Sequence, residues 1–244
     1  MIQFRNVSLV YGEHAALKNV VFQLPKGSLT LLEGHSGAGK SSILRLLATF
    51  ETPSSGDILV GNSSIARLSR RERAHYRRSV GYTGQDVQLL PNRSCFDNVA
   101  LPLRVVGLPE ADVQSRVSAA LSRVGLAHMD RMLPSELSGG QQLRLQIARA
   151  VVNRPALVLA DEPTAQLDDD SASRVVNLLE EFNRAGVTVI VATHEAHRFS
   201  RVTHRLRLGD GQVLPTGSAP VESAPQETGT QSFSRDFLNK AYGA

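Results

Sequence analysis

The sequence predicts an α/β fold with a mixed, mainly parallel core sheet, an antiparallel β edge at the N-terminus and an inserted helical subdomain. Three patterns carry this prediction. Short apolar runs followed by helical periodicity are typical of parallel strands joined by crossover helices. Strict alternation of apolar and polar residues near the N-terminus indicates antiparallel strands, and a long middle stretch with helical periodicity alone indicates the insertion.

The first strands and the first helix are predicted close to the N-terminus. Apolar residues alternate over 3–10 and 15–24, on both sides of the turn-prone Tyr11-Gly12-Glu13, which favours an antiparallel pair. The apolar stretch 28–33 then leads through a glycine-rich turn into a helical pattern at 42–50. This part of the chain therefore has the order strand, strand, strand, loop, helix.

The rest of the core is expected from segments farther along the chain. Buried-type strands are predicted at 79–83, 156–160 and 187–193, and a helix at 171–184 crosses between the last two. The segment 94–152 shows helical patterns only. We therefore expect one domain over 1–214, with a helical subdomain inserted at about 86–153.

The C-terminal residues have a different composition. The stretch 215–232 holds three Pro, three Ser, three Thr and two Gly, with Val221 as its only sizeable apolar residue. Such a segment buries too little surface to offset its ordering entropy, so 215–244 is predicted to be a flexible tail. If a short amphipathic helix forms near the end of this tail, five residues share one of its faces: Phe233, Phe237, Leu238, Ala241 and Tyr242. A frayed end is favoured over a docking peptide, because chain termini are often disordered.

Composition and charge exclude several classes of protein. The 244 residues are 41% hydrophobic and 20% charged, which is ordinary for a folded domain. The net charge of +4 suits phosphates or a membrane surface, whereas 5% aromatic residues argue against binding nucleic-acid single strands by stacking. The single Cys95 excludes an internal disulfide and a cysteine metal cluster, and it suits a reducing compartment. No segment has the pattern of a membrane span or a secretory signal.

A phosphate-binding loop is predicted between the strand at 28–33 and the helix that follows it. The stretch GHSGAGKS fits the pattern G-x-x-x-x-G-K-[ST], which requires a preceding strand and a following helix. Glycines let the loop turn its N–H groups toward a phosphate, Lys40 adds a cation, and the Ser41 hydroxyl suits Mg²⁺. These features predict a P-loop NTPase. The expected ATP-binding residues of the loop are Gly34, His35, Ser36, Gly37, Ala38, Gly39, Lys40, Ser41 and Ser42.

Two adjacent carboxylates end the strand at 156–160. Ligands of parallel sheets bind at the carboxyl ends of the strands, where Asp161 and Glu162 are expected to lie. Asp161 suits a role in holding Mg²⁺, and Glu162 suits a role in orienting or deprotonating the attacking water. The alternative is that both carboxylates merely solvate the end of a strand.

A second helix start of the kind that binds anions follows Leu137. Ser138, Gly139, Gly140 and Gln141 open a helix without a lysine. Together with Gln85 after the strand at 79–83, Asp168 after the carboxylates and His194 after the last parallel strand, these residues make the sequence resemble the nucleotide-binding subunit of an ABC transporter over residues 1–214. The resemblance implies an ABC-type, Mg²⁺-dependent ATPase that forms a head-to-tail homodimer around two ATP molecules.

The resemblance also implies roles for single residues. Ser138, Gly139, Gly140 and Gln141 would complete the ATP site of the partner copy, Tyr11 would stack on adenine and Asp168 would couple the two sites. The implied catalytic residues are Glu162, His194, Gln85 and Lys40, and the implied Mg²⁺ ligands are Ser41, Gln85 and Asp161. Each has a plainer alternative: Tyr11 as a half-buried sheet residue, His194 as a structural histidine and Gln85 as a solvated loop amide. Cys95 is expected to be structural.

Within this family the sequence is most similar to ATPases that act with an integral membrane protein in cell division. The stretches that carry this are GHSGAGKSS, NVALPLRVVG, IARAVVNRPALVLADEPT and LLEEFNRAGVTVIVATH. The alternative is the ATPase subunit of a lipoprotein-release or efflux transporter. An ABC protein acting on DNA or ribosomes is disfavoured, because the chain has neither a second cassette nor a long coiled-coil insertion. The remaining alternative is a nucleotide-dependent scaffold without turnover.

Several residues depart from the family pattern. Gly84 stands where a bulky apolar residue commonly precedes the glutamine, and this glycine is expected to loosen the loop. Leu143 replaces a usual glutamine in the second helix, Ala165-Gln166 replaces Gly-Asn, and Glu195 replaces an aspartate. None of these changes removes a catalytic group.

The resemblance implies a location on the cytoplasmic side of the plasma membrane, with a membrane partner docked near Gln85–Leu103. Division-ring proteins are further candidate partners, and nucleic acid is not. Six apolar residues are expected either to line the docking groove or to belong to the core, with neither favoured: Val87, Leu89, Leu90, Val99, Leu101 and Leu103. An arginine-rich stretch is more typical of a solvated helix face than of a lipid contact: Arg67, Arg70, Arg71, Arg73, Arg77 and Arg78.

Overall fold

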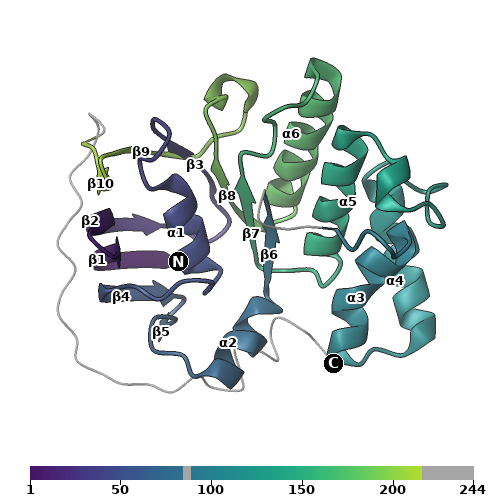
Figure 1. Cartoon of the computed structure of the whole chain (residues 1–244), viewed down its shortest axis with the longest axis horizontal. Coiled ribbons are helices and arrows are strands. Elements are labelled where there is room, and N and C mark those ends of the chain that lie inside the picture. The colour runs from purple at the N-terminus through teal and green to yellow at the C-terminus, as the bar shows by residue number, and fades with distance from the viewer. Residues whose placement is uncertain (85–88, 216–244) are drawn as a thin grey trace.

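The computed structural model describes residues 1–84 and 89–215, and its strands fall into two sheets (Figure 1). The larger sheet has the order β10-β9-β3-β8-β7-β6, and the smaller has the order β2-β1-β4-β5. The strands of the larger sheet are β3 (Leu29–Glu33), β6 (Val80–Thr83), β7 (Leu157–Asp161), β8 (Thr188–Ala192), β9 (His204–Gly209) and β10 (Gln212–Val213). Those of the smaller sheet are β1 (Ile2–Tyr11), β2 (His14–Leu24), β4 (Ser55–Val60) and β5 (Ser63–Ser64).

The core sheet is parallel from β9 to β6, and only β10 runs antiparallel to its neighbour. All five residues of β8 are buried, as expected for a strand covered on both faces. Alternate residues of each strand enter different apolar clusters: Val158 and Val189 face one cluster, whereas Leu159 and Ile190 face the other. The predicted α/β class with parallel and antiparallel strands is therefore confirmed.

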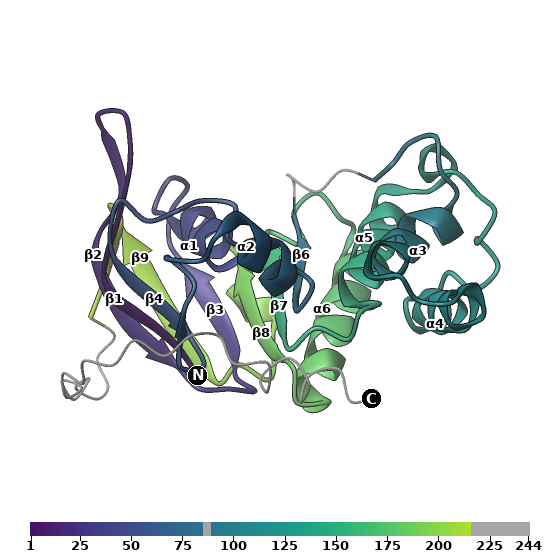
Figure 2. The same cartoon turned by 90° about the horizontal axis from the view of Figure 1, so that it is seen from below.

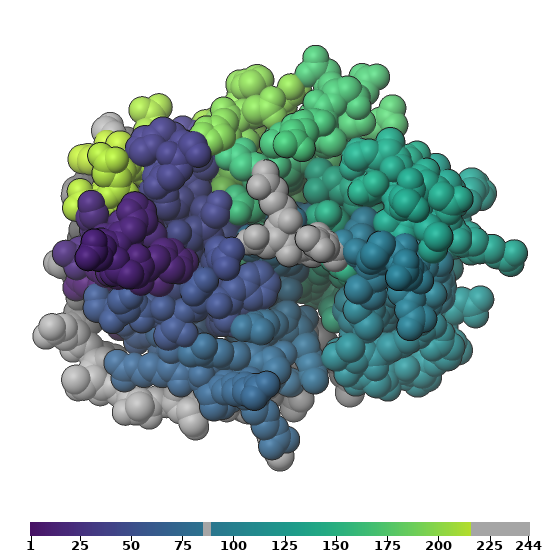
Figure 3. All heavy atoms as spheres, viewed as in Figure 1, coloured from purple at the N-terminus to yellow at the C-terminus, as the bar shows by residue number. Residues whose placement is uncertain are grey.

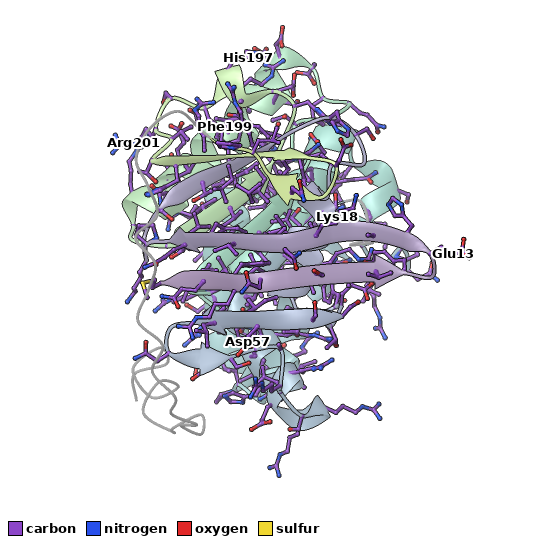
Figure 4. The ribbon with its side chains drawn as sticks, turned by 90° about the vertical axis from the view of Figure 1, so that its left-hand side faces the viewer. Glu13, Lys18, Asp57, His197, Phe199 and Arg201 are labelled. Atoms are coloured by element: carbon purple, nitrogen blue, oxygen red, sulfur yellow. The ribbon has the colours of Figure 1, made fainter. Side chains whose placement is uncertain are left out.

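The N-terminal antiparallel strands form a sheet of their own next to the edge of the core sheet (Figure 4). β1 pairs with β2 on one side and with β4 on the other, and the Phe4 and Phe22 rings stack at 4.3 Å. The two sheets meet where the Lys18 N–H donates to the Gly211 carbonyl oxygen at 2.8 Å. Because β1 is paired on both sides, the free edge of β2 is the one that faces the core sheet. The strands β4, β5, β9 and β10 were not predicted from the sequence.

Helices cover both faces of the core sheet. Their bounds are α1 (Lys40–Leu47), α2 (Arg70–Arg77), α3 (Cys95–Val106), α4 (Glu110–Arg123), α5 (Gly139–Val151) and α6 (Asp169–Arg184), with short 3₁₀ helices at Pro134–Glu136 and Ala196–Arg198. Viewed from below, the smaller sheet lies on one side of the core sheet, and α3 to α6 lie on the other (Figure 2). α1 begins two residues before the predicted start, because Gly39 with φ +101° directly precedes it.

The middle of the chain packs as a helical layer beside β6 and α6. Val99, Val117 and Leu145 of α3, α4 and α5 are fully buried and share one apolar cluster with Val158 of the core sheet. In the space-filling view this layer forms the right-hand part of the molecule (Figure 3). Cys95 is buried in it, and burial raises the pKa of its thiol, which agrees with a structural role. The division into domains stays a prediction.

Some predictions fall on residues outside 1–84 and 89–215. Gln85 and Val87 are among them, and so is the expected tail except for Pro215. Within the described ranges, every helix is too short or too polar to span a bilayer.

The junction of the two sheets yields a prediction about stability. A Cβ on Gly211, whose φ is +78°, would lie 2.8 Å from the Ala16 carbonyl oxygen, whereas one on Gly12, at φ +59°, would meet nothing within 4 Å. We expect Gly12→Ala to cost about 1 kcal/mol from backbone strain alone, and Gly211→Ala to cost at least about twice that. Urea unfolding midpoints measure both losses. Equal losses would contradict the close approach of the two sheets.

Candidate functional site

The predicted phosphate loop lies at the carboxyl end of β3, directly before α1. Gly37 has φ +80°, and a Cβ there would meet nothing within 4 Å. A Cβ on Gly39 would lie 2.7 Å from Leu17 Cδ2 and 2.8 Å from the Ala16 carbonyl oxygen. Gly39 is therefore required where the loop packs against β2, and Gly37 leaves the loop backbone open to the adjoining cavity.

Lys40 stands at the centre of the site with its side chain only 6% exposed. Its Nζ donates to the carbonyl oxygens of Gly34 at 2.8 Å and His35 at 3.3 Å. The same nitrogen lies 3.6 Å from Glu162 Oε1 and 3.1 Å from His194 Nε2. Three segments far apart in the sequence therefore converge on one ammonium group at the carboxyl ends of β3, β7 and β8.

Glu162 and His194 also contact each other. Glu162 Oε2 accepts a hydrogen bond from the His194 backbone N–H at 3.2 Å, and its Oε1 lies 3.2 Å from His194 Nε2. Glu162 has φ +45°, a left-handed conformation that costs free energy in a residue with a Cβ and that recurs at functional sites. This conformation turns Glu162 away from the direction of β7 and toward the loop after β8.

The donor set around Ser41 fits Mg²⁺. The Ser41 hydroxyl donates to Asp161 Oδ1 at 3.0 Å, so a hydroxyl and a carboxylate oxygen lie side by side next to the phosphate loop. Oxygen ligands are those that Mg²⁺ prefers, and it commonly takes only one or two from the protein and the rest from phosphates and water. Among the described residues, no three or more His, Cys, Asp or Glu side chains cluster in a way suited to a metal.

A cavity of about 550 Å³ brings the predicted residues together, which is within the usual range for a small-molecule site. Tyr11 stands at its mouth, 41% exposed at the end of β1, and burial raises the pKa of its hydroxyl. The cavity is lined by Tyr11, His14, Ala16, Ser36, Gly37, Ala38, Gly39, Lys40, Ser41, Ser42, Asp161, Glu162, Ala165, His194 and Glu195. Sequence reasoning missed His14, although the Gly12-Glu13 turn brings it beside Tyr11.

Two predicted loop residues contribute backbone rather than side chain. Gly34 and His35 offer carbonyl oxygens to Lys40, and neither lines the cavity. The His35 ring instead lies beside Asp210, with Nε2 3.6 Å from the nearer carboxylate oxygen.

The second predicted anion-binding helix start borders a separate, smaller cavity, where Gly139 lies with Asp161 and Glu162. Ser138 and Gln141 form a capping box at the start of α5, with Ser138 N–H donating to Gln141 Oε1 at 2.8 Å. A Cβ on Gly139 would meet nothing within 4 Å, whereas one on Gly140 would lie 2.8 Å from Ser171 Oγ. Within the described residues of one chain, none of the residues 138–141 lines the cavity around Lys40.

Asp168 caps the neighbouring helix. Its Oδ1 accepts the backbone N–H of Ser171 at 2.9 Å at the start of α6, and hydrogen bonds from Ser171 lower the pKa of its carboxyl. Asp169, the next residue, forms an ion pair with Arg198 at 2.7 Å, and Arg198 also binds Glu195 at 2.8 Å. Arg198 therefore ties the loop after His194 to the start of α6, a link that sequence reasoning did not predict.

Gly84 directly precedes the undescribed residues 85–88. A Cβ on Gly84 would lie 2.8 Å from the Cβ of Asp161. Close packing against Asp161 is therefore a structural reason for glycine at this position.

The expected docking residues divide between core and surface. Val99 and Leu103 are fully buried, so the interpretation of these two as groove residues is wrong. Leu90 and Leu101 are 38% and 41% exposed, so these two lie on the surface. Leu89 is partly buried against the core.

The arginine-rich stretch also divides. Arg77 donates to the Thr49 carbonyl oxygen at 2.6 Å and lies over the Phe50 ring, and Arg73 donates to the Leu68 carbonyl oxygen at 3.0 Å. Arg70 and Arg71 are exposed at the start of α2. This agrees with a solvated helix face that is partly tied to the domain.

The family of the chain follows from this geometry and from comparison with known proteins. The fold is that of a P-loop nucleotide-binding domain, and residues 17–165 match the model of the ABC transporter family. The chain belongs to this family and is an ATPase of the ABC type.

Curated relatives resemble the chain over most of its length. The cell division ATP-binding protein FtsE of Escherichia coli (strain K12) is 48% identical over 215 residues, which are 87% of this chain and 97% of that protein. FtsE of Haemophilus influenzae is 47% identical over 197 residues, 80% of this chain and 90% of that protein. The methionine import ATP-binding protein MetN of Bradyrhizobium diazoefficiens is 38% identical, over 96% of this chain and 70% of that protein.

Solved structures of ATP-binding cassettes have the same fold. The dimeric structure of a post-hydrolysis state of the cassette MJ0796, bound to ADP and Pi, matches with a TM-score of 0.81 and 32% identity, covering 87% of this chain and 96% of that chain. A second dimeric structure of MJ0796, described as a bacterial ABC transporter cassette, matches with a TM-score of 0.82 and 33% identity over the same shares.

The Arg198 link yields a prediction about catalysis. Arg198→Ala frees Glu195 and Asp169 together and so loosens the loop that carries His194. We expect kcat for ATP hydrolysis to fall about fivefold while ATP affinity changes less than about twofold, because Arg198 does not touch the phosphate loop. The matched control is Arg201→Ala, which removes an exposed arginine at the surface (Figure 4). An equal loss of kcat in both variants would contradict a positioning role for Arg198.

Proposed function

We propose that this chain is the ATP-hydrolysing subunit of an FtsE-like complex that acts in cell division through an FtsX-like integral membrane partner. The observation that carries the proposal is the identity of 48% to FtsE over 97% of that protein, which exceeds the identity to MetN over a smaller share of MetN. The alternative is the ATPase subunit of a lipoprotein-release or efflux transporter. The convergence of Lys40, Glu162 and His194 supports turnover over a scaffold role.

In the proposed mechanism, the loop backbone from Ser36 to Ser42 and the Lys40 ammonium bind the phosphates of ATP. Ser41 and Asp161, with Gln85, hold Mg²⁺, which supplies charge neutralisation on the phosphate oxygens. Glu162 orients the attacking water and accepts its proton, and His194 holds the γ-phosphate. Tyr11, at the cavity mouth, stacks on adenine.

ATP hydrolysis on this proposal needs a second copy of the chain. Ser138, Gly139 and Gly140 lie outside the cavity around Lys40, and the space beside Gly139 is open. A head-to-tail homodimer would bring these residues, with Gln141, onto ATP held by the other copy. Asp168, at the start of α6 next to Gly140, would couple the two ATP sites of the dimer. The dimeric form of the similar MJ0796 cassette supports this arrangement.

The FtsX-like partner is proposed to dock on exposed apolar residues that follow position 88, chiefly Leu90 and Leu101. The chain would then lie on the cytoplasmic face of the plasma membrane, held there by its partner. Division-ring proteins are further candidate partners, and no contact with nucleic acid is proposed.

The two-copy site predicts a separation of binding from hydrolysis. Lys40→Ala removes the cation that faces the phosphates, so we expect ATP affinity to fall more than about tenfold. Ser138→Arg places a bulky cation at the start of α5, away from the cavity of its own chain, so ATP binding by the monomer should persist while cooperative hydrolysis disappears. Nucleotide titration and the Hill coefficient of phosphate release measure the two effects. Equal loss of ATP binding in both variants would contradict a site built from two copies.

The membrane role is tested by co-expressing the chain with an FtsX-like protein from the same organism. We expect the pair to co-purify in detergent and to release phosphate faster than the Glu162→Gln variant. Leu101→Arg should break the complex, whereas Leu133→Arg, an equally exposed residue outside the docking segment, should not. Co-purification with the membrane subunit of a lipoprotein-release system instead would overturn the division role and leave the ATPase assignment intact.

A further inference from the structure

A groove between α4 and α6 lies outside everything assigned above. Two cavities, of about 380 and 280 Å³, adjoin there and share Arg123 at the end of α4. Both are bordered by α5, which lies between α4 and α6 (Figure 1). We call this surface the α4–α6 groove.

The groove follows one face of α6. Arg174, Leu178, Glu181, Phe182 and Ala185 line it at helical spacing, so it extends for about 17 Å at a rise of 1.5 Å per residue. This length accommodates a short segment of another polypeptide. A small metabolite would fill only one of the two cavities.

The charge of the groove is strongly positive. Glu181 is the only acidic side chain among the described lining residues. Five arginines line the groove: Arg116, Arg123, Arg144, Arg154 and Arg174. Within residues 1–84 and 89–215, the guanidinium groups of Arg116, Arg154 and Arg174 have no hydrogen bond or ion pair. Unpaired arginines that share one concave surface attract a partner with several negative charges.

Arg144 shows that this charge is not compensated within the domain. Its Nη1 donates to the Val124 carbonyl oxygen at 2.9 Å, while its Nε is buried and has no hydrogen-bond partner among the described residues. Burial, and then repulsion by Arg174, lowers the pKa of Arg144. A carboxylate from outside would relieve this repulsion.

The floor of the larger cavity is apolar. Val152, Val158 and Phe182 are at most 7% exposed and form this floor. Arg123 lies over the Phe182 ring at 5.1 Å, and Arg116 and Arg154 border the same cavity. A large apolar side chain fits against the floor while acidic neighbours reach the arginines around it and in the adjoining cavity.

The groove is remote from the nucleotide. Val158 lies near the start of β7, whereas Asp161 ends that strand beside the phosphate loop. Because the carboxyl ends of the parallel strands carry the ATP site, a ligand in the groove contacts the opposite end of the sheet. Its binding is therefore compatible with bound nucleotide.

We propose that the α4–α6 groove binds an acidic segment of a partner protein that carries a large apolar side chain. A bilayer is a poorer fit, because a flat surface cannot fill a groove whose floor residues are at most 7% exposed. A nucleic-acid single strand is also a poorer fit, because the Phe182 ring in the groove is covered by Arg123. This inference does not depend on the proposed role in cell division.

The test uses the full chain and a short fluorescein-labelled peptide of glutamates around a central Phe-Leu pair. Fluorescence anisotropy, at low and at raised salt, measures its dissociation constant. We expect Arg116→Glu with Arg174→Glu to weaken binding at least about tenfold. The matched control, Arg70→Glu with Arg71→Glu, makes the same change of charge on α2 and should leave binding unchanged. Basal ATP hydrolysis and the melting temperature should be the same in both variants.

Several outcomes would overturn the proposal. The first is that the unaltered chain does not bind the peptide. The second is that both charge-reversed variants bind the peptide equally weakly. The third is that a glutamate peptide with alanines in place of the Phe-Leu pair binds as tightly as the original peptide. Groove-dependent binding of phosphatidylglycerol vesicles or of a DNA oligonucleotide, without peptide binding, would assign the groove to that other partner. If the charge-reversed groove variant fails to fold, Arg116→Gln with Arg174→Gln carries the same test.

Discussion

The candidate site depends on one ammonium group held in a fixed position. Lys40 Nζ is bound by two carbonyl oxygens of its own loop and faces Glu162 and His194 from two other strands. A buried cation is costly unless it is paired and hydrogen-bonded, and here both conditions are met by groups that the parallel sheet supplies. The contacts tie the phosphate loop to the loops after β7 and β8, so a change at any one of these loops reaches the other two.

The sheet can do this because its strands are buried on both faces. Hydrophobic burial holds β3, β7 and β8 in register, and their carboxyl ends therefore present Glu33, Asp161 and Ala192 at one edge. The residues that follow these ends leave the strand direction through Gly34 and Glu162, which have φ +153° and φ +45°. The apolar core thus provides rigidity, and a glycine and a left-handed Glu162 after it provide direction. This division explains why the polar site occupies so little of the sequence.

Sequence reasoning succeeded where one contiguous segment carries both the local structure and the chemistry. The position of the phosphate loop between a strand and a helix, the position of the Asp161-Glu162 pair at a strand end and the helix that opens after Ser138 are of this kind, because strand, turn and helix signals flank each of them. It failed where pairing partners lie far apart in the chain. The edge strands β4 and β9 owe their existence to β1 and β3, and the link from Arg198 to Asp169 joins residues from different loops. Val99 and Leu103 were ambiguous, since an apolar helix face looks the same whether a core or a partner covers it.

The same limit explains why the α4–α6 groove has no sequence signature. Its arginines come from three segments of the chain and become neighbours only when α4, α5 and α6 pack against each other. Packing alone does not require them, because the apolar cluster beneath is closed by valines, leucines and Phe182. Like charges brought together without internal partners reduce the stability of a fold, so the free energy that offsets them must come from the rest of the core. The chain therefore carries two concave charged surfaces: one around Lys40, whose cation is paired within the chain, and one in the α4–α6 groove, whose arginines face outward.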